Sequence, residues 1–154
     1  MDKAEFTRRA SGCAKQLYKI SWCILRSNAD CEDAVQEALL RAWAKLHTLR
    51  NADHFETWLT RILINECRGM LRRRQRTGTT ELTENIAAPD AAEGDVFAAI
   101  QRMDRRYAMP LLLRHMSGYT VGEIGKILRI PETTVKWRLK EGRRRLRALL
   151  AAEG

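Results

Sequence analysis

Residues 116–150, MSGYTVGEIGKILRIPETTVKWRLKEGRRRLRALL, predict two helices joined by a tight turn. Thr120 would cap the first helix, and Glu123 three residues later completes a capping box. Gly125 is the small residue that a close helix crossing needs, and Pro131 suits the first turn of the second helix. Cap, small residue, turn, proline and basic helix follow each other in the order of a helix-turn-helix. An ordinary helical hairpin is the alternative.

The second helix of this motif has an apolar side and a basic side. A recognition helix in the major groove places its first residues at base edges and its later basic residues on phosphates. In the turn before it, Arg129 replaces the usual glycine, and a left-handed backbone would cost an arginine about 1 kcal/mol. The predicted inward stripe is Val135, Leu139, Gly142, Leu146 and Leu149. The predicted outward stripe is Thr133, Lys136, Trp137, Lys140, Arg144 and Arg147.

In the N-terminal half, apolar residues that recur every three or four positions predict further helices. The first runs from about Lys3 to Leu25, and Asn28 to Asp30 offers caps for the second. An exposed leucine among acidic neighbours on the second helix is typical of a partner-binding surface, although a single stray leucine is common. The apolar stripe of the second helix is Val35, Ala38, Leu39, Ala42, Trp43 and Leu46. Its opposite side is Asp33, Gln36, Glu37, Leu40 and Arg41.

The third predicted helix, about His54 to Arg74, carries two different stripes. Guanidinium groups grip phosphates, an amide reads a base edge and an indole stacks on an unpaired base, so the polar stripe predicts DNA contact. A solvated helix face is the alternative. Glu66 falls on the apolar side and needs an arginine partner or a place at the rim. The apolar stripe is Phe55, Leu59, Ile62, Leu63 and Met70. The polar stripe is Trp58, Arg61, Asn65, Arg68 and Arg72.

The net charge of +9 over 154 residues is unevenly distributed. Residues 1–74 carry 14 basic and 9 acidic side chains, and residues 96–154 carry 13 and 5. Between them, residues 75–95 carry 1 basic and 5 acidic side chains together with Pro89, and are typical of a flexible linker. Two basic blocks on a tether suit a long anionic partner such as nucleic acid, with solvated helix faces as the alternative.

Several other classes of protein are disfavoured by what the sequence lacks. No apolar run approaches the ~18 residues of a membrane span, and the first residues lack a signal-peptide core, so we expect no membrane insertion and a cytoplasmic location. The four cysteines lack the C-x-x-C spacing of a zinc site and are expected to be free, mostly buried thiols. Scattered histidines, with no nucleophile motif or phosphate loop, argue against an enzyme, a metal site and a cofactor.

Three segments together resemble the bacterial sigma-70-family initiation factors, and most closely their small extracytoplasmic-function (ECF) class. Residues 30–43, DCEDAVQEALLRAW, resemble the helix that binds core RNA polymerase. Residues 55–65, FETWLTRILIN, resemble the segment that recognises and melts the −10 promoter element. Residues 130–139, IPETTVKWRL, continued by residues 142–146, resemble the helix that reads the −35 element.

The resemblance implies an all-α fold of two small helical domains. Residues 1–74 would form sigma region 2, residues 75–95 an acidic flexible linker, and residues 96–154 sigma region 4. The implied function is a dissociable promoter-specificity subunit without a catalytic site of its own. Its implied partners are core RNA polymerase, through the β′ clamp helices and the β subunit, promoter DNA and a separate anti-sigma protein. It would act in the bacterial cytoplasm, at the nucleoid when active.

The resemblance also implies roles for individual residues. Holding a flipped-out −10 base costs a few kcal/mol in lost stacking and pairing, so a pocket in the loop Leu46 to Asp53 must offset that cost. The implied polymerase-binding residues are Asp33, Gln36, Glu37, Leu40 and Arg41. The implied −10 residues are Leu49, Arg50, Asn51, Trp58, Arg61, Asn65, Arg68 and Arg72. The implied −35 residues are Arg114, Pro131, Thr134, Lys136, Trp137, Lys140 and Arg144.

Several positions depart from the pattern of the family, among them Met103-Asp104, which replaces its usual Leu-Pro. Trp137 stands where the family commonly has a small residue, Arg129 replaces a turn glycine, and Glu66 replaces a small or neutral residue. These departures concern the promoter sequence, because the polymerase-binding segment is intact. A stand-alone DNA-binding regulator that uses only the C-terminal motif is the alternative function, but it leaves residues 30–43 and 55–65 unexplained.

Overall fold

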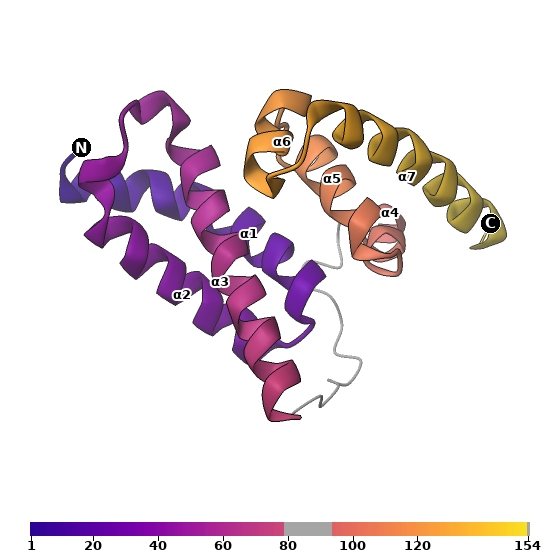
Figure 1. The fold of residues 1–154 in the computed structure, drawn as a ribbon, viewed down its shortest axis with the longest axis horizontal. Coiled ribbons are helices and arrows are strands. Elements are labelled where there is room, and N and C mark those ends of the chain that lie inside the picture. Colours follow the sequence, from indigo (N-terminus) through magenta and orange to yellow (C-terminus); the bar gives the residue numbers. More distant parts are fainter. Residues whose placement is uncertain (79–93, 154) are drawn as a thin grey trace. The chain divides into compact units, whose positions relative to one another are not determined.

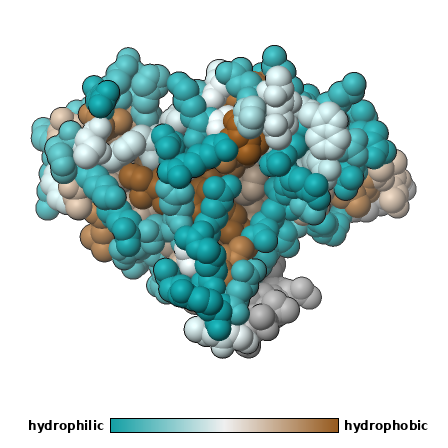
Figure 2. Space-filling view, in the orientation of Figure 1, coloured by the Kyte–Doolittle hydropathy of each residue, from teal (hydrophilic) through white to brown (hydrophobic). Residues whose placement is uncertain are grey.

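The structure, a computed structural model, describes residues 1–78 and 94–153. These residues are helical without a strand among them, and the chain divides into two compact units, Met1–Ile86 and Ala87–Gly154 (Figure 1). The prediction of two small helical domains is confirmed. In the space-filling view, hydrophilic side chains cover most of the visible face and hydrophobic ones show between them (Figure 2).

The N-terminal unit is a bundle in which α1, α2 and α3 pack against each other. The side chain of Asp2 accepts a hydrogen bond from Glu5 N–H (2.9 Å) and caps α1, which has the predicted bounds. The cap of α2 is Ser27, which accepts from Asp30 N–H, so the predicted cap at Asn28 to Asp30 is wrong by one residue. The elements are α1 (Lys3–Leu25), α2 (Asn28–Ala44), the 3-10 turns η1 (Leu46–Thr48) and η2 (Ala52–His54), and α3 (Phe55–Thr77).

The buried stripe of α2 differs from the predicted one. Ala34, Ala38 and Ala42 are fully buried, whereas Leu39 is half-buried and Trp43 is 45% exposed. Small side chains allow α2 to approach both α1 and α3 closely, which large side chains on that stripe would prevent. The larger residues therefore lie at the edge of the bundle.

The third helix is longer than the sequence predicted. Phe55, Leu59 and Leu63 are fully buried as expected, while Ile62 and Met70 are only half-buried. The helix continues through residues 75–77, which were predicted to belong to the linker, because Gln and Arg favour helix and nothing stops it before a glycine. Gly78 then ends it with φ +76°. Residues 79–93 of the predicted linker lie outside the described residues, and Gly94 already belongs to the next helix.

The C-terminal unit is built around its last helix, which packs against the other three. Val135 and Leu139 of the predicted inward stripe are fully buried, and a Cβ on Gly142 would lie 3.2 Å from the Leu111 side chain. Leu146 and Leu149 are only half-buried, because the helix extends beyond the elements that cover its first part. The elements are α4 (Gly94–Gln101), α5 (Arg105–His115), α6 (Val121–Leu128) and α7 (Glu132–Glu153).

The helix-turn-helix prediction is confirmed in its local details. Thr120 and Glu123 form both hydrogen bonds of the capping box. Arg129 has a left-handed backbone, with φ +60°. Gly125 is needed for its close approach to the turn rather than for the predicted helix crossing, since a Cβ there would lie 2.9 Å from the carbonyl oxygen of Ile130. α7 begins at Glu132, directly after Pro131, whose carbonyl accepts the first helical hydrogen bond from Val135 N–H (3.1 Å).

Candidate polymerase-binding and DNA-binding surfaces

The exposed side of α2 is a mixed acidic and apolar surface. Its five predicted residues, Asp33 to Arg41, are all exposed, and Leu40 is 65% exposed. Arg41 is held by two carboxylates, with its Nε 3.3 Å from Glu37 and 2.5 Å from Glu66. Glu66 is 14% exposed, so its predicted need for an arginine partner is confirmed. Two helices thus fix Arg41 at this surface.

Leu40 also borders an apolar groove that the sequence did not predict. Phe6 on α1 meets Trp43 on α2 edge-to-face, with ring centroids 5.2 Å apart, and meets Phe55 on α3 in the same way at 5.6 Å. Periodicity within one helix does not reveal this groove, because its two walls come from different helices. The groove is lined by Lys3, Phe6, Thr7, Gln36, Leu39, Leu40 and Trp43.

The loop between α2 and α3, predicted to hold a base, consists of the two 3-10 turns and the residues between them. Arg50 and Asn51 are exposed, and Leu49 is half-buried. The side-chain oxygen of Asn51 accepts a hydrogen bond from Asp53 N–H (2.9 Å) and so caps η2. Capping uses the oxygen of Asn51, so its amide NH₂ is the group that could donate to a base.

The polar stripe of α3 becomes more exposed toward the end of the helix. Trp58 and Arg61 are half-buried, and the Trp58 ring lies 6.1 Å from the Phe55 ring. Asn65 and Arg72 are exposed and lie in one groove with residues of α2. The structure thus brings two predicted −10 residues next to the predicted polymerase-binding side of α2. That groove is lined by Asp33, Glu37, Arg41, Asn65, Glu66, Gly69, Met70, Arg72 and Arg73.

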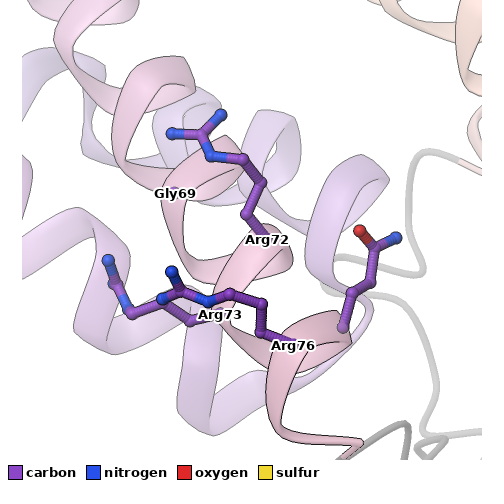
Figure 3. A pocket seen from close by; sticks show the side chains of 5 residues that line it. Gly69, Arg72, Arg73 and Arg76 are labelled. Carbon is purple, nitrogen blue, oxygen red and sulfur yellow. The ribbon is translucent and has the colours of Figure 1, made fainter.

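The arginine run at the end of α3 divides into two roles. Arg72, Arg73 and Arg76 project from the last turns of the helix and line a hollow with Gly69 and Gln75 (Figure 3). The guanidinium groups of Arg73 and Arg72 lie 3.5 and 3.8 Å from the position of a Cβ on Gly69. A concentration of positive charge at one helix end is suited to phosphate groups.

Arg74 serves the fold instead. Its guanidinium group binds Asp30 at 3.0 Å and the carbonyl oxygen of Leu25 at 3.1 Å, so it joins the end of α3 to the junction between α1 and α2. The sequence could not separate this arginine from its neighbours, because the partners lie more than 40 residues away.

The outward stripe of α7 is exposed as predicted, and it lies on the second helix of the motif. Pro131 and Arg114 are also exposed, whereas Thr134 is half-buried. Arg114 donates to the carbonyl oxygen of Tyr119 (3.0 Å) and so supports the turn between α5 and α6. Arg144 of the stripe and the neighbouring Arg145 bind Glu141 at 2.6 and 2.9 Å. These hydrogen bonds lower the pKa of Glu141 to about 2, so it is ionised at neutral pH.

The cysteines show the electrostatics of buried thiols. All four are free, and three are buried as predicted, while Cys13 is half-buried. Burial raises the pKa of Cys13 to about 11 and the pKa of Cys23 and Cys67 to about 12, so these thiols are protonated at neutral pH. Across residues 1–78 and 94–153, no group of three His, Cys, Asp or Glu residues is placed to hold a metal ion. Over the same ranges, no helix is long and apolar enough to cross a membrane.

Comparisons with known proteins match both units of this chain. The family Sigma-70 region 2 matches residues 11–77, and the family Sigma-70, region 4 matches residues 94–146. The ECF RNA polymerase sigma factor SigM of Mycobacterium tuberculosis is 30% identical over 143 residues, which cover 88% of this chain and 72% of SigM. The chain belongs to the ECF sigma factors of the sigma-70 family.

One further relative and two solved structures are also similar to this chain. The ECF sigma factor SigW of Bacillus subtilis is 27% identical to this sigma factor over 155 residues, covering 88% of it and 83% of SigW. The sigma factor RpoE of Bartonella quintana, solved with its anti-sigma factor NepR, has a TM-score of 0.83 at 24% identity and covers 97% of this chain and 99% of RpoE. CnrH, solved with the cytosolic domain of CnrY, has a TM-score of 0.73 at 22% identity, covering 99% of this chain and 92% of CnrH. Both structures are similar to this chain in fold.

Proposed function

We propose that this sigma factor binds core RNA polymerase and directs it to promoters that its two units read at the −10 and −35 elements. The observation that carries the proposal is the presence of region 2 and region 4 in one chain, each with its own exposed surface. A stand-alone DNA-binding regulator would need only the second of these. Action at promoters implies a place at the bacterial nucleoid.

The exposed side of α2 is the proposed contact with the clamp helices of the β′ subunit. Leu40 supplies exposed apolar area, and Glu37 and Arg41 form a charged pair beside it. Apolar contacts rimmed by polar groups are typical of helix-in-groove recognition. The neighbouring groove, with Phe6 and Trp43, extends this surface onto α1.

The −10 element is the proposed ligand of the loop and of α3. Arg50, Asn51 and Asn65 are exposed and offer the polar groups that a flipped-out base requires. Arg68 and Arg72 continue the same helix and would bind the phosphates of the melted strand. Trp58 and Arg61 are half-buried, so we propose that they support this surface and contact DNA only through their exposed edges.

The −35 element is the proposed ligand of α7. Lys136, Trp137 and Lys140 are exposed in its first half, where a recognition helix meets base edges. Arg144, later in α7, and Arg114, on α5, are exposed and suited to phosphates. Pro131 directly precedes α7.

An anti-sigma protein is the proposed regulator. Two solved structures of similar fold are complexes, one of the sigma factor RpoE with the anti-sigma factor NepR and one of CnrH with the cytosolic domain of CnrY. Here, the apolar groove beside Leu40 and the basic stripe of α7 are the surfaces that such a regulator would have to cover. Covering both would block polymerase and DNA binding at once.

Run-off transcription with core polymerase tests the proposed function. We expect specific transcripts only when this chain is added, and their start sites would reveal the promoters. The double variant Leu40→Ala with Glu37→Ala should weaken binding to core polymerase and leave the base preference at −10 unchanged. Asn65→Ala should do the reverse. Arg8→Ala, an exposed change on α1, is the control for charge removal. Absence of any complex with core polymerase would refute the proposal and favour the stand-alone regulator.

A further inference from the structure

We propose that Trp137 determines specificity at the −35 element by packing its indole on the methyl group of a thymine. The proposal rests on the proposed role of α7 as the −35 recognition helix. Trp137 is 56% exposed, a large apolar surface on a helix whose outward side is otherwise basic and polar. In the major groove, the methyl group of thymine is the apolar feature that a side chain can recognise.

Trp137 lies where such a contact is possible. α7 begins at Glu132, so Trp137 is in its second turn, within the part of a recognition helix that reaches base edges. Thr133, Trp137, Lys140 and Arg144 follow each other at helical spacing on the outward side, and the three apart from Trp137 are also exposed. The indole is therefore flanked along the helix by groups that bind bases or phosphates.

Contacts within the unit hold the indole in place. The Trp137 ring is 6.1 Å from the ring of Tyr107, which is buried on α5. The guanidinium group of Arg145 lies over the Tyr107 ring, 4.3 Å from its centre, and is bound by Glu141 at 2.9 Å. The tilted ring contact restricts the exposed Trp137 side chain, and the cation–π contact ties Arg145 to the Tyr107 ring beside it. Tyr107, Arg145 and Glu141 are thus positioning residues for Trp137.

The charge around Trp137 favours DNA over an apolar protein surface as its partner. Lys136 and Lys140 flank it, and the nearest acidic side chain on the same helix, Glu141, is already neutralised by two arginines. An apolar partner surface would have to bury these lysines without a counter-charge, which is costly. Duplex DNA instead places phosphates next to the base edges, so it satisfies the lysines and the indole together.

The test uses the holoenzyme, assembled from core polymerase and the full chain, on a promoter mapped by run-off transcription. Each thymine of the −35 element is replaced in turn by deoxyuridine, which removes only the methyl group. For the wild type, we expect one position at which this change weakens binding about fourfold, the weight of one buried methyl group. Trp137→Ala should bind both duplexes equally, and Trp137→Phe should keep part of the difference.

Two further variants separate base reading from other roles. Lys140→Ala should weaken binding to thymine and deoxyuridine duplexes by the same factor, because an ammonium group that binds a phosphate or a polar base edge does not sense the methyl group. Glu141→Gln should reduce the methyl dependence while Trp137 is still present, because Arg145 loses the carboxylate that holds it over the Tyr107 ring. Circular dichroism checks that each variant is folded.

The outcomes are distinct. The inference is overturned if no thymine shows a methyl dependence, if Trp137→Ala keeps the wild-type dependence, or if Trp137→Ala weakens only the binding of a protein partner. If the wild-type holoenzyme initiates at no promoter, the proposed function itself fails and the inference fails with it.

Discussion

At the scale of single residues, two arginines adopt a left-handed backbone that favours glycine: Arg26 with φ +54° and Arg129 with φ +60°. Both end a helix, and the N–H of each donates to a carbonyl four residues earlier, so the strain belongs to the helix stop. At Arg129, this conformation sets the direction of the chain into the recognition helix. The sequence indicated the cost at Arg129 and did not reveal Arg26.

Arg129→Gly should therefore stabilise the C-terminal unit by up to about 1 kcal/mol, because glycine adopts this conformation without strain and loses only part of the gain to its freer unfolded chain. The free energy of unfolding, measured by hydrogen exchange of α6 and α7, checks this. Lys126→Gly, three residues earlier within α6, is the matched control and should destabilise by about 1 kcal/mol. Equal effects of the two variants would contradict the account.

The buried thiols give a pH dependence. Since burial raises the pKa of Cys23 and Cys67 from 9.0 to about 12, the unfolded chain loses these protons first as the pH rises. The stability of the N-terminal unit should be unaffected by them below pH 9 and should fall between about pH 9 and pH 12. Denaturant unfolding over this range measures the fall, and Cys67→Ala should make it shallower. A stability that rises with pH in this window would refute the assignment.

At the scale of elements, small residues decide how closely helices and turns approach. The alanine stripe of α2 brings three helices together, and Gly125 lets the turn of the helix-turn-helix close over α6. In both cases the sequence predicted the helix but not the distance to its neighbour. That distance determines which large side chains remain at the surface, including Leu40 and Trp43.

Two glycines of α6 provide a matched pair of variants. Gly125→Ala should destabilise the C-terminal unit by roughly 1–3 kcal/mol, because its Cβ would meet the backbone oxygen of Ile130 at 2.9 Å and the turn must shift. Gly122→Ala meets the flexible side chain of Glu132 at 3.4 Å and the Thr120 hydroxyl at an ordinary 4.0 Å, and should be neutral or stabilising by up to about 1 kcal/mol. Hydrogen exchange and thermal unfolding of the two variants measure the difference. A Gly125→Ala variant as stable as Gly122→Ala would mean that the turn is not closely packed.

At the scale of the whole molecule, the basic side chains are divided between two units that each present an exposed basic surface. The N-terminal unit offers the arginines at the end of α3, and the C-terminal unit offers the outward stripe of α7. If both surfaces bind the same promoter, their contributions to the salt dependence of binding should add, because contacts with different phosphates release counterions independently.

We expect Lys136→Ala with Lys140→Ala to reduce the slope of log affinity against log salt for holoenzyme and promoter by about 2, and Arg72→Ala with Arg73→Ala to do the same. The quadruple variant, which carries all four changes, should reduce this slope by about 4. Filter binding over a range of salt concentrations measures these slopes, with Arg8→Ala as the control that leaves the slope unchanged. If the quadruple variant loses no more of this slope than one of the double variants does, only one unit holds the DNA.

The sequence by itself determined α1, α2, α3, α6 and α7 approximately, together with the capping box, the strained turn and the family, because these depend on residues close together in the chain. It also predicted which sides of α2, α3 and α7 are exposed. Only the tertiary structure showed that Ala34 joins the predicted Ala38 and Ala42 in the buried stripe of α2 while Trp43 stays exposed. The groove between Phe6 and Trp43 and the tie of Arg74 to Asp30 also came from the tertiary structure alone. The tertiary structure alone also placed the Tyr107 ring next to the Trp137 ring. These features depend on side chains from separate helices, and their distances follow from how closely those helices pack.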